Sequence, residues 1–300
     1  SSTMARSFPP DVVIIDTDAL VHARFARGKN GMRLVQAKPY RLAAETFTAS
    51  TVTPQLTNES VLAETLRRLR NETGRWEKVS LLLPDSWFRI NIVDLPSLPH
   101  DEAEALDVVR WSLKRTLPIA PELLRVSYTV LSREGQAAKV LVLSALEATL
   151  AAIEKVFATA GLDVVLIEPL GLNIWNAIAV REAETTADRL FLYVRDTDFT
   201  TAVFRGSQPL FIRSRNLSGE RSVEQEIRLS ASYLRDTLAV ESFEHCYVAG
   251  IGGTAVHETL ATEFNTNVRS VALRDYVEET PADIHNLDAE LTACTGVFTG

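Results

Sequence analysis

Two short acidic turns in this sequence of 300 residues have a position and composition that raise the question of phosphate binding. Each has the sequence Asp-Thr-Asp, at 16–18 and 196–198, and each follows an apolar run typical of a buried strand. A turn between two strands can hold a phosphate on its backbone N–H groups, most easily where glycine lets the backbone close. Both turns carry a second aspartate at that position. Three interpretations are open: a nucleotide site, the remains of one, or an ordinary hairpin.

Other catalytic signatures are missing from the sequence. The five histidines are scattered without metal-ligand spacing, and no G-x-S-x-G motif is present. The stretch "GIGGTA" at 250–255 fits the loose dinucleotide pattern G-x-G-x-x-A, but it follows hairpins and not parallel βαβ units. A plain strand-to-helix turn is therefore favoured there. Asp85, which follows "VSLLLP", is interpreted as a strand-end turn residue and not as a catalytic base.

Composition and charge narrow the class of protein. With 46% apolar residues, the chain can bury a large core in two domains or in one bilobal fold. A net charge of −8 gives no global reason to expect a nucleic-acid partner. Cys246 and Cys294 lie far apart in apolar surroundings, which predicts buried, reduced thiols in a cytoplasmic protein. The longest apolar stretch contains Glu168 and Pro169 and is not predicted to span a membrane, and residues 1–10 lack the apolar core of a signal peptide.

The elements that must position the two turns are predicted to repeat along the chain. In the N-terminal half, strand patterns and one helical pattern succeed each other at 12–15, 19–25, 33–38, 58–74 and 79–85. The same order returns at 190–194, 199–204, 209–213, 218–238 and 245–253. Glycine-containing turns of hairpin type join the second and third strands of both halves. The order strand-strand-strand-helix-strand, found twice, predicts a duplicated α/β fold.

A different unit lies between the two halves. Its strand and helix patterns follow the order β-α-β-β-α-β, at 88–95, 101–117, 125–131, 139–144, 147–160 and 164–168. This is the order of a split-βαβ unit. A helix at 169–180 is predicted to return the chain to the first half. The predicted domains are a first lobe (11–87 with 169–188), an inserted subdomain (88–168) and a second lobe (189–300).

The repeated lobes with phosphate-type turns resemble the actin/Hsp70/sugar-kinase architecture, an actin-like (ribonuclease H-like) fold. Within that architecture, four stretches resemble the PilM family of actin-like cytoplasmic proteins of type IV pilus assembly, which is related to FtsA and to the cytoplasmic domain of type II secretion GspL. The stretches are "LDVVRWSLKRTLPIAPELLRVSYTVL" (106–131), "LSALEATLAAIEKVFATAGLDVVLIEPLGLNIWNAI" (143–178), "LFIRSRNLSGE" (210–220) and "YVAGIGGTAVHETLATEF" (247–264).

The resemblance implies a cleft that could hold ATP and Mg²⁺, with Asp16 holding the metal through water. The residues implied at the nucleotide are Asp16, Thr17, Asp18, Asp196, Thr197, Asp198, Gly250, Gly252 and Gly253. The family usually has glycine where this chain has Asp18 and Asp198, and two extra carboxylates beside a triphosphate cost several kcal/mol unless Mg²⁺ offsets them. The family's extra subdomain in the second lobe is predicted to be reduced or lost. Nucleotide binding and a degenerate cleft kept for its shape both stay open.

The function implied by the resemblance is a non-catalytic cytoplasmic scaffold of a type IV pilus assembly platform. Such a scaffold lies peripheral to the inner membrane because it binds the cytoplasmic tail of a single-pass partner resembling PilN, alongside other platform components. Two alternatives are an ATP-dependent small-molecule kinase of the same superfamily and a type II secretion platform protein. The kinase predicts tight binding and turnover of Mg-ATP, which the scaffold does not.

The resemblance also implies that the tail docks beside the inserted subdomain, against the first lobe. The residues predicted to line that groove are Leu81, Ile92, Leu95 and Leu172, and "NIVDLPSLP" (91–99) has the apolar and proline content that suits a wall beside an extended peptide. The alternative is that these side chains fill the junction between subdomains. A charge at Ile92 or Leu95 would abolish tail binding in the first case and unfold the protein in the second.

Overall fold

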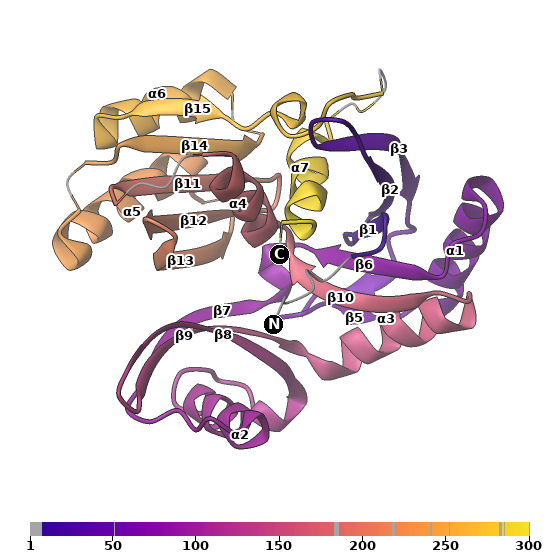
Figure 1. Ribbon diagram of the computed structural model, residues 1–300, viewed down its shortest axis with the longest axis horizontal. Helices are drawn as coiled ribbons and strands as arrows, with labels where there is room; N and C mark the ends of the chain where they lie inside the picture. Colours follow the sequence, from indigo (N-terminus) through magenta and orange to yellow (C-terminus); the bar gives the residue numbers. More distant parts are fainter. Residues whose placement is uncertain are drawn as a thin grey trace.

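The computed structural model describes residues 8–50, 52–182, 186–217, 220–240, 242–251, 253–281, 284 and 286–299. In this part of the chain, two five-stranded sheets form the centres of two lobes, and a three-stranded sheet forms a smaller unit beside them (Figure 1). The predicted duplicated α/β fold with an inserted unit is confirmed.

The first-lobe sheet joins an antiparallel meander to parallel strands. It contains β1 (Asp11–Ile15), β2 (Ala19–Arg27), β3 (Met32–Arg41), β6 (Lys78–Leu83) and β10 (Asp163–Pro169), in the spatial order β10-β6-β1-β2-β3. The central strand β1 pairs antiparallel with β2 and parallel with β6. All five residues of β1 are buried, which explains its unbroken apolar run after Asp11. Two short strands, β4 (Phe47–Thr48) and β5 (Gln55–Leu56), pair with each other outside this sheet.

The second-lobe sheet repeats this topology strand for strand. It contains β11 (Asp188–Val194), β12 (Asp198–Arg205), β13 (Gln208–Asn216), β14 (His245–Gly250) and β15 (Asn267–Ser270), in the order β13-β12-β11-β14-β15. As in the first lobe, the first strand pairs antiparallel with the second and parallel with the fourth. The two lobes are therefore copies of one unit, as the repeated order of elements predicted.

Helices at matching positions cover the outer faces of both sheets. α1 (Glu59–Thr73) and α5 (Val223–Leu238) each connect the third and fourth strands of their lobe, and α3 (Glu147–Thr159) and α6 (Gly253–Phe264) each precede a fifth strand. Asn58 caps α1 by accepting the N–H of Val61, and Ser222 caps α5 in a reciprocal box with Gln225. α5 ends at Leu238 and β14 begins at His245, so the short connection has no room for a further subdomain.

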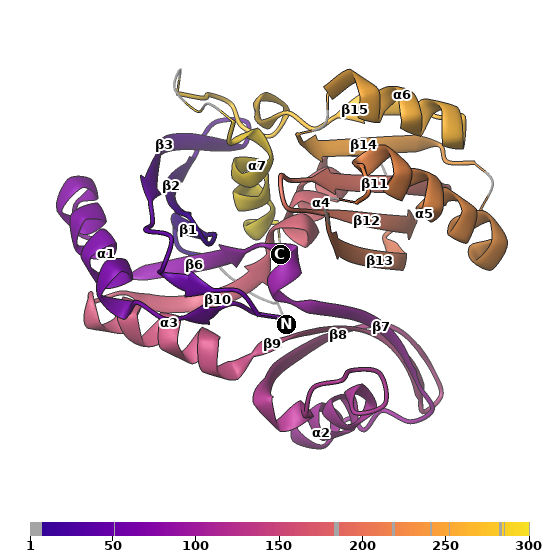
Figure 2. The ribbon, with the colours of Figure 1, turned by 180° about the vertical axis from the view of Figure 1, so that it is seen from behind.

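Two helices lie between the sheets and join the lobes (Figures 1 and 2). α4 (Leu170–Arg181) and α7 (Asp288–Val297) share one hydrophobic core with the inner faces of β1 and β11. Trp175 of α4 stacks on Phe204 of β12, with ring centroids 3.8 Å apart. At Gly296 of α7, a Cβ would overlap the carbonyl oxygen of Asn173, so the helices cross with their backbones in close approach. The interlobe contact is therefore close-packed and not a solvent-filled space.

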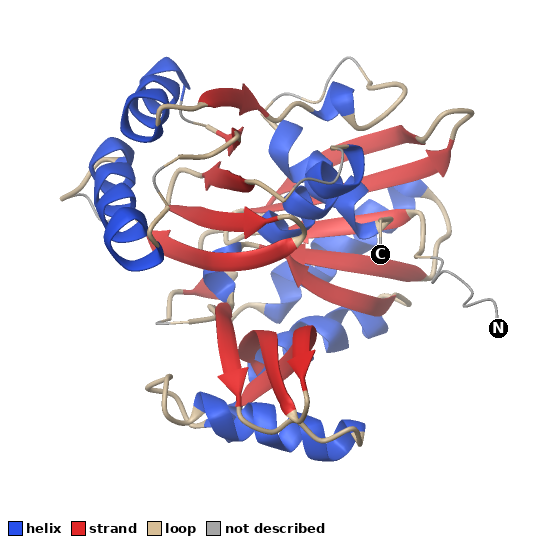
Figure 3. Cartoon of the chain, turned by 60° about the vertical axis from the view of Figure 1, so that its left-hand side comes forward, coloured by secondary structure: helices blue, strands red, loops and turns tan. Residues whose placement is uncertain are grey.

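The inserted unit is smaller than predicted. It consists of β7 (Arg89–Leu95), α2 (Glu102–Leu113), β8 (Leu124–Glu134) and β9 (Ala137–Leu146), with the sheet order β7-β9-β8. The unit projects from the lobes, and α2 lies on the side of its sheet away from them (Figure 3). Its core is formed by buried side chains of α2 and the three strands. Short 3₁₀ turns occur at η1 (Asp85–Trp87), η2 (Pro121–Leu123) and η3 (Leu273–Asp275).

The predicted boundary of the insertion at 168 is wrong. β10, which was assigned to a split-βαβ insertion, pairs in parallel with β6 and belongs to the first-lobe sheet. α3 packs Leu150, Ile153 and Phe157 into the core shared with α1. The chain therefore returns to the first lobe at the end of β9, and the insertion has the order β-α-β-β.

Candidate functional site

The two acidic turns approach each other where the lobes meet. Arg195, which directly precedes the second turn, donates to the carboxylate of Asp16 in the first turn. Arg195 Nε also lies 3.7 Å from Oδ1 of Asp198. Burial acts to lower the pKa of Arg195, but the carboxylates around it, Asp16 first, hold that pKa above its usual range. One largely buried guanidinium thus lies between carboxylates from both lobes.

The two turns are equivalent with a displacement of one residue. The N–H of Asp16 donates to the carbonyl of Ala19 over 2.8 Å, and the N–H of Arg195 donates to the carbonyl of Asp198 over 2.9 Å. Asp16 therefore corresponds to Arg195, and Ala19 corresponds to Asp198. The strand registers agree, because Ile15 lies opposite Leu20 as Val194 lies opposite Phe199. The alignment of Asp-Thr-Asp on Asp-Thr-Asp is thus wrong by one position.

This displacement separates the predicted site residues into two groups. Asp16 is partly buried and Asp198 is almost fully buried, and both face the interlobe contact. The Oγ atoms of Ser86 and Thr197 each donate to Oδ2 of Asp198 over 3.1 Å. The other predicted turn residues are exposed to solvent: Thr17, Asp18, Asp196 and Thr197. Burial raises the pKa of Asp16, with Arg195 acting against that rise.

Asp85 connects the lobes and was assigned only a turn role from the sequence. It begins η1 after β6, as expected, but its side chain is buried. Thr200 Oγ1 of the second lobe donates to Oδ2 over 2.5 Å, and the Gly171 N–H at the start of α4 donates to Oδ1 over 2.7 Å. Burial raises the pKa of Asp85 to about 6 despite these two hydrogen bonds. A Cβ at residue 171 would overlap Oδ2 of Asp85, so glycine is needed there.

A second buried acid lies beside the same contact. The hydroxyl of Tyr193 on β11 donates to Oε1 of Glu290 on α7 over 3.0 Å. Burial raises the pKa of Glu290 and raises that of Tyr193 well above its usual value. Pattern analysis of the sequence missed both residues, because each belongs to a regular element and has no motif around it.

Gly250, the last residue of β14, lies next to the second turn. Gly250 has φ +88°, and a Cβ there would overlap the carbonyl oxygen of Val194, the residue before Arg195. Gly253 begins α6 with φ +56°. Gly252 lies outside the described residues. β14 ends at Gly250 and α6 begins at Gly253, as expected for a strand-to-helix connection, and close backbone approach requires glycine at residue 250.

The four residues predicted for a partner groove do not come together. Leu81 is buried in the first-lobe core and Leu95 in the core of the insertion, so neither can line an open groove. Ile92 is half-buried on β7, and Leu172 is half-buried near Asp85 between the lobes. The prediction was wrong for Leu81 and Leu95, because an apolar strand pattern does not distinguish a core from a groove wall.

A groove does lie between the insertion and the first lobe, on another face. It has a volume of about 190 Å³ and runs between two sheet-edge strands, β10 of the first lobe and β8 of the insertion. Val165 on β10 is 41% exposed, at a register shift in the pairing of β10 with β6. Arg125 in the groove wall is held by the carboxylates of Glu147 and Glu154. We call this feature the β10 groove; it is lined by Phe88, Arg125, Ser127, Leu143, Ser144, Ala145, Leu150, Glu154 and 164–167.

Solved structures match the chain over nearly its whole length. A chain of the PilM–PilN type IV pilus biogenesis complex is 18% identical, with a TM-score of 0.78, over 95% of this chain and 96% of that one. A Bacteroides thetaiotaomicron protein with an actin-like ATPase fold and unknown function is 10% identical, with a TM-score of 0.57, over 97% and 95%. This chain has the actin-like fold. The cytoplasmic domain of EpsL, an inner-membrane component of the type II secretion system of Vibrio cholerae, is 11% identical, with a TM-score of 0.55, over 97% and 94%.

The first of these similarities agrees with the resemblance to the PilM family found in the sequence. No protein-family model matches the chain, and no curated protein matches it in sequence. At identities of this size, the similarity establishes the actin-like fold and the arrangement of its lobes.

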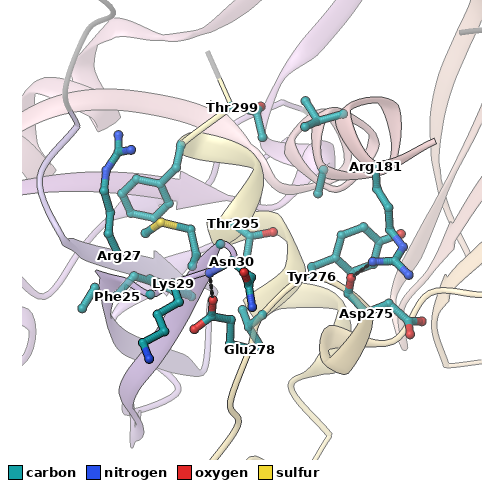
Figure 4. Close-up of a pocket in the computed structure, with 18 of the residues that line it drawn as sticks. Phe25, Arg27, Lys29, Asn30, Arg181, Asp275, Tyr276, Glu278, Thr295 and Thr299 are labelled. Carbon is teal, nitrogen blue, oxygen red and sulfur yellow. Dashed lines mark hydrogen bonds between the residues drawn. The ribbon is translucent and has the colours of Figure 1, made fainter. Parts of the chain in front are cut away.

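A large cavity lies away from the acidic turns. It has a volume of about 990 Å³ and is lined by residues that include Phe25, Tyr276 and Thr295 (Figure 4). Its lining also includes Pro10, directly before β1, whereas Asp16 follows the end of that strand. Two of its charged side chains have partners. Glu278 accepts the N–H of Asn30, and Arg181 donates to the carbonyl of Asp275 and lies 5.7 Å from the ring centre of Tyr276. None of the residues predicted for a nucleotide lines this cavity.

The remaining expectations concern cysteine, metal and membrane. Cys246 and Cys294 are both buried free thiols, as predicted, and burial raises the pKa of Cys246 to about 12. Among the described residues, no group of three or more His, Cys, Asp or Glu is arranged to hold a metal ion. No helix in the described part of the chain has the length and apolar character that crossing a bilayer requires.

Proposed function

We propose that this chain is a non-catalytic scaffold on the cytoplasmic face of an inner membrane, in a type IV pilus assembly platform. It would hold the cytoplasmic tail of a single-pass membrane protein resembling PilN. The actin-like fold supports the proposal, as does the similarity to a chain from a complex of PilM with PilN. Without a membrane-crossing helix in its described part, the chain would reach the membrane through this partner.

The observation that carries the proposal is the β10 groove. An extended peptide can add to an exposed sheet edge through main-chain hydrogen bonds, while pockets beside the strand select its side chains. β10 pairs with β6 on one side, and on the other it faces the groove wall formed by β8 and β9. The partly exposed apolar side chains of Leu143, Val165 and Leu166 would receive apolar side chains of the tail.

The cleft between the lobes supports the non-catalytic part of the proposal. A Mg²⁺ ion held by Asp16 through water would compete with the guanidinium of Arg195, which is already bonded to that carboxylate. The buried carboxylate of Asp198 would repel a phosphate from the same space. These residues do not fit Mg-ATP. We infer that the ion pairs of Arg195 with Asp16 and Asp198 hold the cleft closed. Its guanidinium then occupies the space that a ligand would need.

The test is binding of the chain to synthetic peptides that cover the cytoplasmic tails of the single-pass membrane proteins encoded beside it. We expect one peptide to bind saturably in calorimetry. Val165→Glu should lower its affinity at least tenfold, because a charge would replace the exposed apolar side chain of the β10 wall that the tail would cover. Val35→Glu is the matched control: Val35 is 45% exposed on β3, the opposite edge strand of the same sheet.

Four outcomes would contradict the proposal. If no tail peptide binds, or if both valine variants bind the tail as the unchanged protein does, the β10 groove is not the docking site. If millimolar Mg-ATP binds tightly and is turned over, the small-molecule kinase alternative is correct and the cleft opens in solution. Dependence on a type II secretion tail peptide in place of a pilus tail would favour the other secretion platform.

A further inference from the structure

A buried threonine of the first lobe bonds to both chain connections of the insertion. Thr53 lies between β4 and β5 and is fully buried. Its Oγ1 donates to the carbonyl of Trp87 over 2.7 Å and accepts the N–H of Leu146 over 2.9 Å. Trp87 ends η1 shortly before β7, and Leu146 is the last residue of β9. One hydroxyl therefore joins the two places where the chain enters and leaves the insertion.

This hydroxyl lies where the ladder between β7 and β9 ends. The last pair of that ladder is Arg89 with Ser144. Beyond it the two chains diverge, because Trp87 belongs to η1 and Leu146 is followed directly by α3. A hydroxyl can donate and accept at the same time, so the single side chain of Thr53 serves a carbonyl of one chain and an N–H of the other.

The loop that carries Thr53 is itself fixed to the first lobe. Ser50 Oγ donates to the carbonyl of Thr53 over 2.6 Å, and Thr149 Oγ1 on α3 donates to the carbonyl of Pro54 over 2.9 Å. Val52 and Pro54, on either side of Thr53, are buried. The hydroxyl of Thr53 therefore has a defined position relative to α3.

The two peptide groups that Thr53 holds are next to the β10 groove. Phe88, which follows Trp87, and Ala145, which precedes Leu146, both line that groove. β8 belongs to the insertion and β10 to the first lobe, so the angle between the two units sets the width of the groove between them. Thr53 acts on that angle, because it holds both connections about which the insertion could turn.

A second polar contact joins the same two units. Arg125 on β8 pairs with Glu147 and Glu154 on α3, and all three side chains are partly exposed. Solvent and the entropy of long side chains leave such ion pairs little net stabilisation. The bonds of Thr53 are buried, where a backbone group that loses its partner carries the full cost of desolvation. Of these two contacts, Thr53 is therefore the one that fixes the angle.

We propose that Thr53 is a positioning residue of the β10 groove. Its hydroxyl holds the insertion at the angle at which the groove can take an extended tail. Thr53 would not touch the tail, because it is fully buried and does not line the groove. The inference rests on the proposed function for its binding measurement, whereas the angle itself is measurable without a tail.

The angle is measured first, on the full chain without peptide. Arg67→Cys on α1 and Gln136→Cys between β8 and β9 place spin labels at two exposed positions, one in each unit. Cys246 and Cys294 are buried and stay unlabelled in the folded protein. We expect a narrow distribution of distances between the labels. Thr53→Val keeps the shape of the side chain without its hydroxyl and should broaden the distribution, and Thr53→Ser should keep it narrow.

Tail binding is measured next, with the peptide that binds the unchanged protein. Thr53→Val should lower its affinity about tenfold, because only the fraction of molecules with the insertion at the competent angle binds. Thr53→Ser should bind within about twofold of the unchanged protein, since the hydroxyl restores that fraction. Rescue by serine separates the hydrogen bonds of Thr53 from its packing.

The matched control is a threonine with equal burial and a local hydrogen bond. Thr292 on α7 is also fully buried, and its hydroxyl donates to the carbonyl of Asp288 in the same helix. Thr292→Val should change neither the distance distribution nor the affinity. If Thr53→Val does not fold, Thr149→Val replaces it, because it releases Pro54 from α3 and should also broaden the distribution and weaken tail binding.

Two results would overturn the proposal. A distance distribution that stays narrow in the valine variant would show that apolar packing alone fixes the angle. A broadened distribution with unchanged tail affinity would show that the angle does not control binding. The proposed function fails in a different way: no tail peptide would bind the unchanged protein, while the distance measurement would still report whether Thr53 holds the insertion.

Discussion

In the first lobe the residue that leaves the central strand is Asp16, and in the second lobe it is Arg195. The backbone of both turns is the same, with one N–H donating to the carbonyl three residues further on. The side chains at the equivalent positions have opposite charges, and they pair across the contact between the lobes. The two copies of the unit thus form an ion pair with each other at the place where an actin-like fold could otherwise hold a ligand.

The comparison extends to the fourth residue of each turn. In the first lobe it is Ala19, and in the second it is Asp198, which is buried and accepts hydrogen bonds from Ser86 and Thr197. The second lobe therefore contributes Arg195 and Asp198 to this contact. From the first lobe, Asp16 pairs with Arg195, Ser86 donates to Asp198, and Asp85 accepts from Thr200. The two Asp-Thr-Asp sequences therefore do not have matching roles. The role of each side chain depends on its backbone position in the turn, and the tripeptides differ in that position by one residue.

Removing the cation should have the largest effect on stability. Arg195→Ala leaves Asp16 and Asp198 without their buried counter-charge, and we expect a loss of about 3–5 kcal/mol in the free energy of unfolding. Urea denaturation at neutral pH measures this loss. Exchanging the charges, in the double variant Asp16→Arg with Arg195→Asp, should recover part of it because the pair is then restored in reverse. A double variant no more stable than the sum of its single losses would show that the two positions do not interact.

Removing Asp198 should cost less, and the same change in the first turn should cost nothing. Asp198→Ala removes a buried acceptor of two hydrogen bonds, for which we expect about 2 kcal/mol in urea denaturation. Asp18 has the same place in the tripeptide but is exposed, so Asp18→Ala should leave the denaturation midpoint unchanged. Equal losses in the two variants would restore the equivalence suggested by the sequence and refute the displacement by one residue.

The pH dependence of the free energy of unfolding tests the ionisation of Asp85, a buried first-lobe acid that accepts a hydrogen bond from the second lobe. Asp85 has a pKa of about 6 in the folded protein, above the ordinary value of 3.8, so the folded state holds a proton that the unfolded state has already released. Its contribution to stability is therefore complete below about pH 4 and is lost as the pH rises through 6. Two pKa units of difference correspond to about 3 kcal/mol.

Asp85→Asn removes this titration and keeps a group of the same shape. The variant should gain stability relative to the unchanged protein as the pH rises from about 4 to about 7, by up to the amount just given. Asp16 and Glu290, whose pKa values are also raised by burial, contribute a slope of the same sign in both proteins. Parallel pH profiles for the variant and the unchanged protein would show that Asp85 is ionised throughout.

The smallest effect is expected where glycine is restored to the first turn. Asp18→Gly gives the turn the residue that phosphate-binding turns favour, but it leaves Arg195 on Asp16. We expect no shift of the melting temperature by millimolar Mg-ATP, in this variant or in the unchanged protein. A clear shift in Asp18→Gly alone would mean that the extra aspartate, and not Arg195, is what excludes a nucleotide.

Much of the fold could be predicted because its signals are local. The apolar runs of β1 and β11, the Asn58 and Ser222 caps and the repeated order of elements all stand within short stretches of sequence. Sheet membership is not local. β10 follows α3 directly and completes a plausible β-α-β-β-α-β order, yet it pairs with β6, which precedes the whole insertion in the chain. The order of elements along the chain does not show which strand a sheet-edge strand pairs with.

The site was less predictable, for a different reason. Asp16 and Asp198 were expected near the contact between the lobes, but Arg195 stood outside the motif, and only the hydrogen-bond register shows that it is the counterpart of Asp16. The apolar residues Leu81 and Leu95 looked suited to a groove, and they are core residues of two separate units. An apolar sequence pattern predicts that a side chain is buried. Whether a groove forms depends on how the packed units are placed in space, which the pattern does not contain.

The crossing of α4 and α7 has a mechanical consequence. β10 runs without a break into α4 at Pro169 and Leu170, and α4 meets α7 where Gly296 lets the backbones approach. A hinge needs a flexible stretch at its pivot, and here the pivot is two helices in direct contact. The close backbone contact therefore resists a hinge opening of the lobes at this crossing. A pulling force on a tail docked at β10 would be transmitted through α4 to the contact between the lobes, because β10 and α4 form one continuous segment.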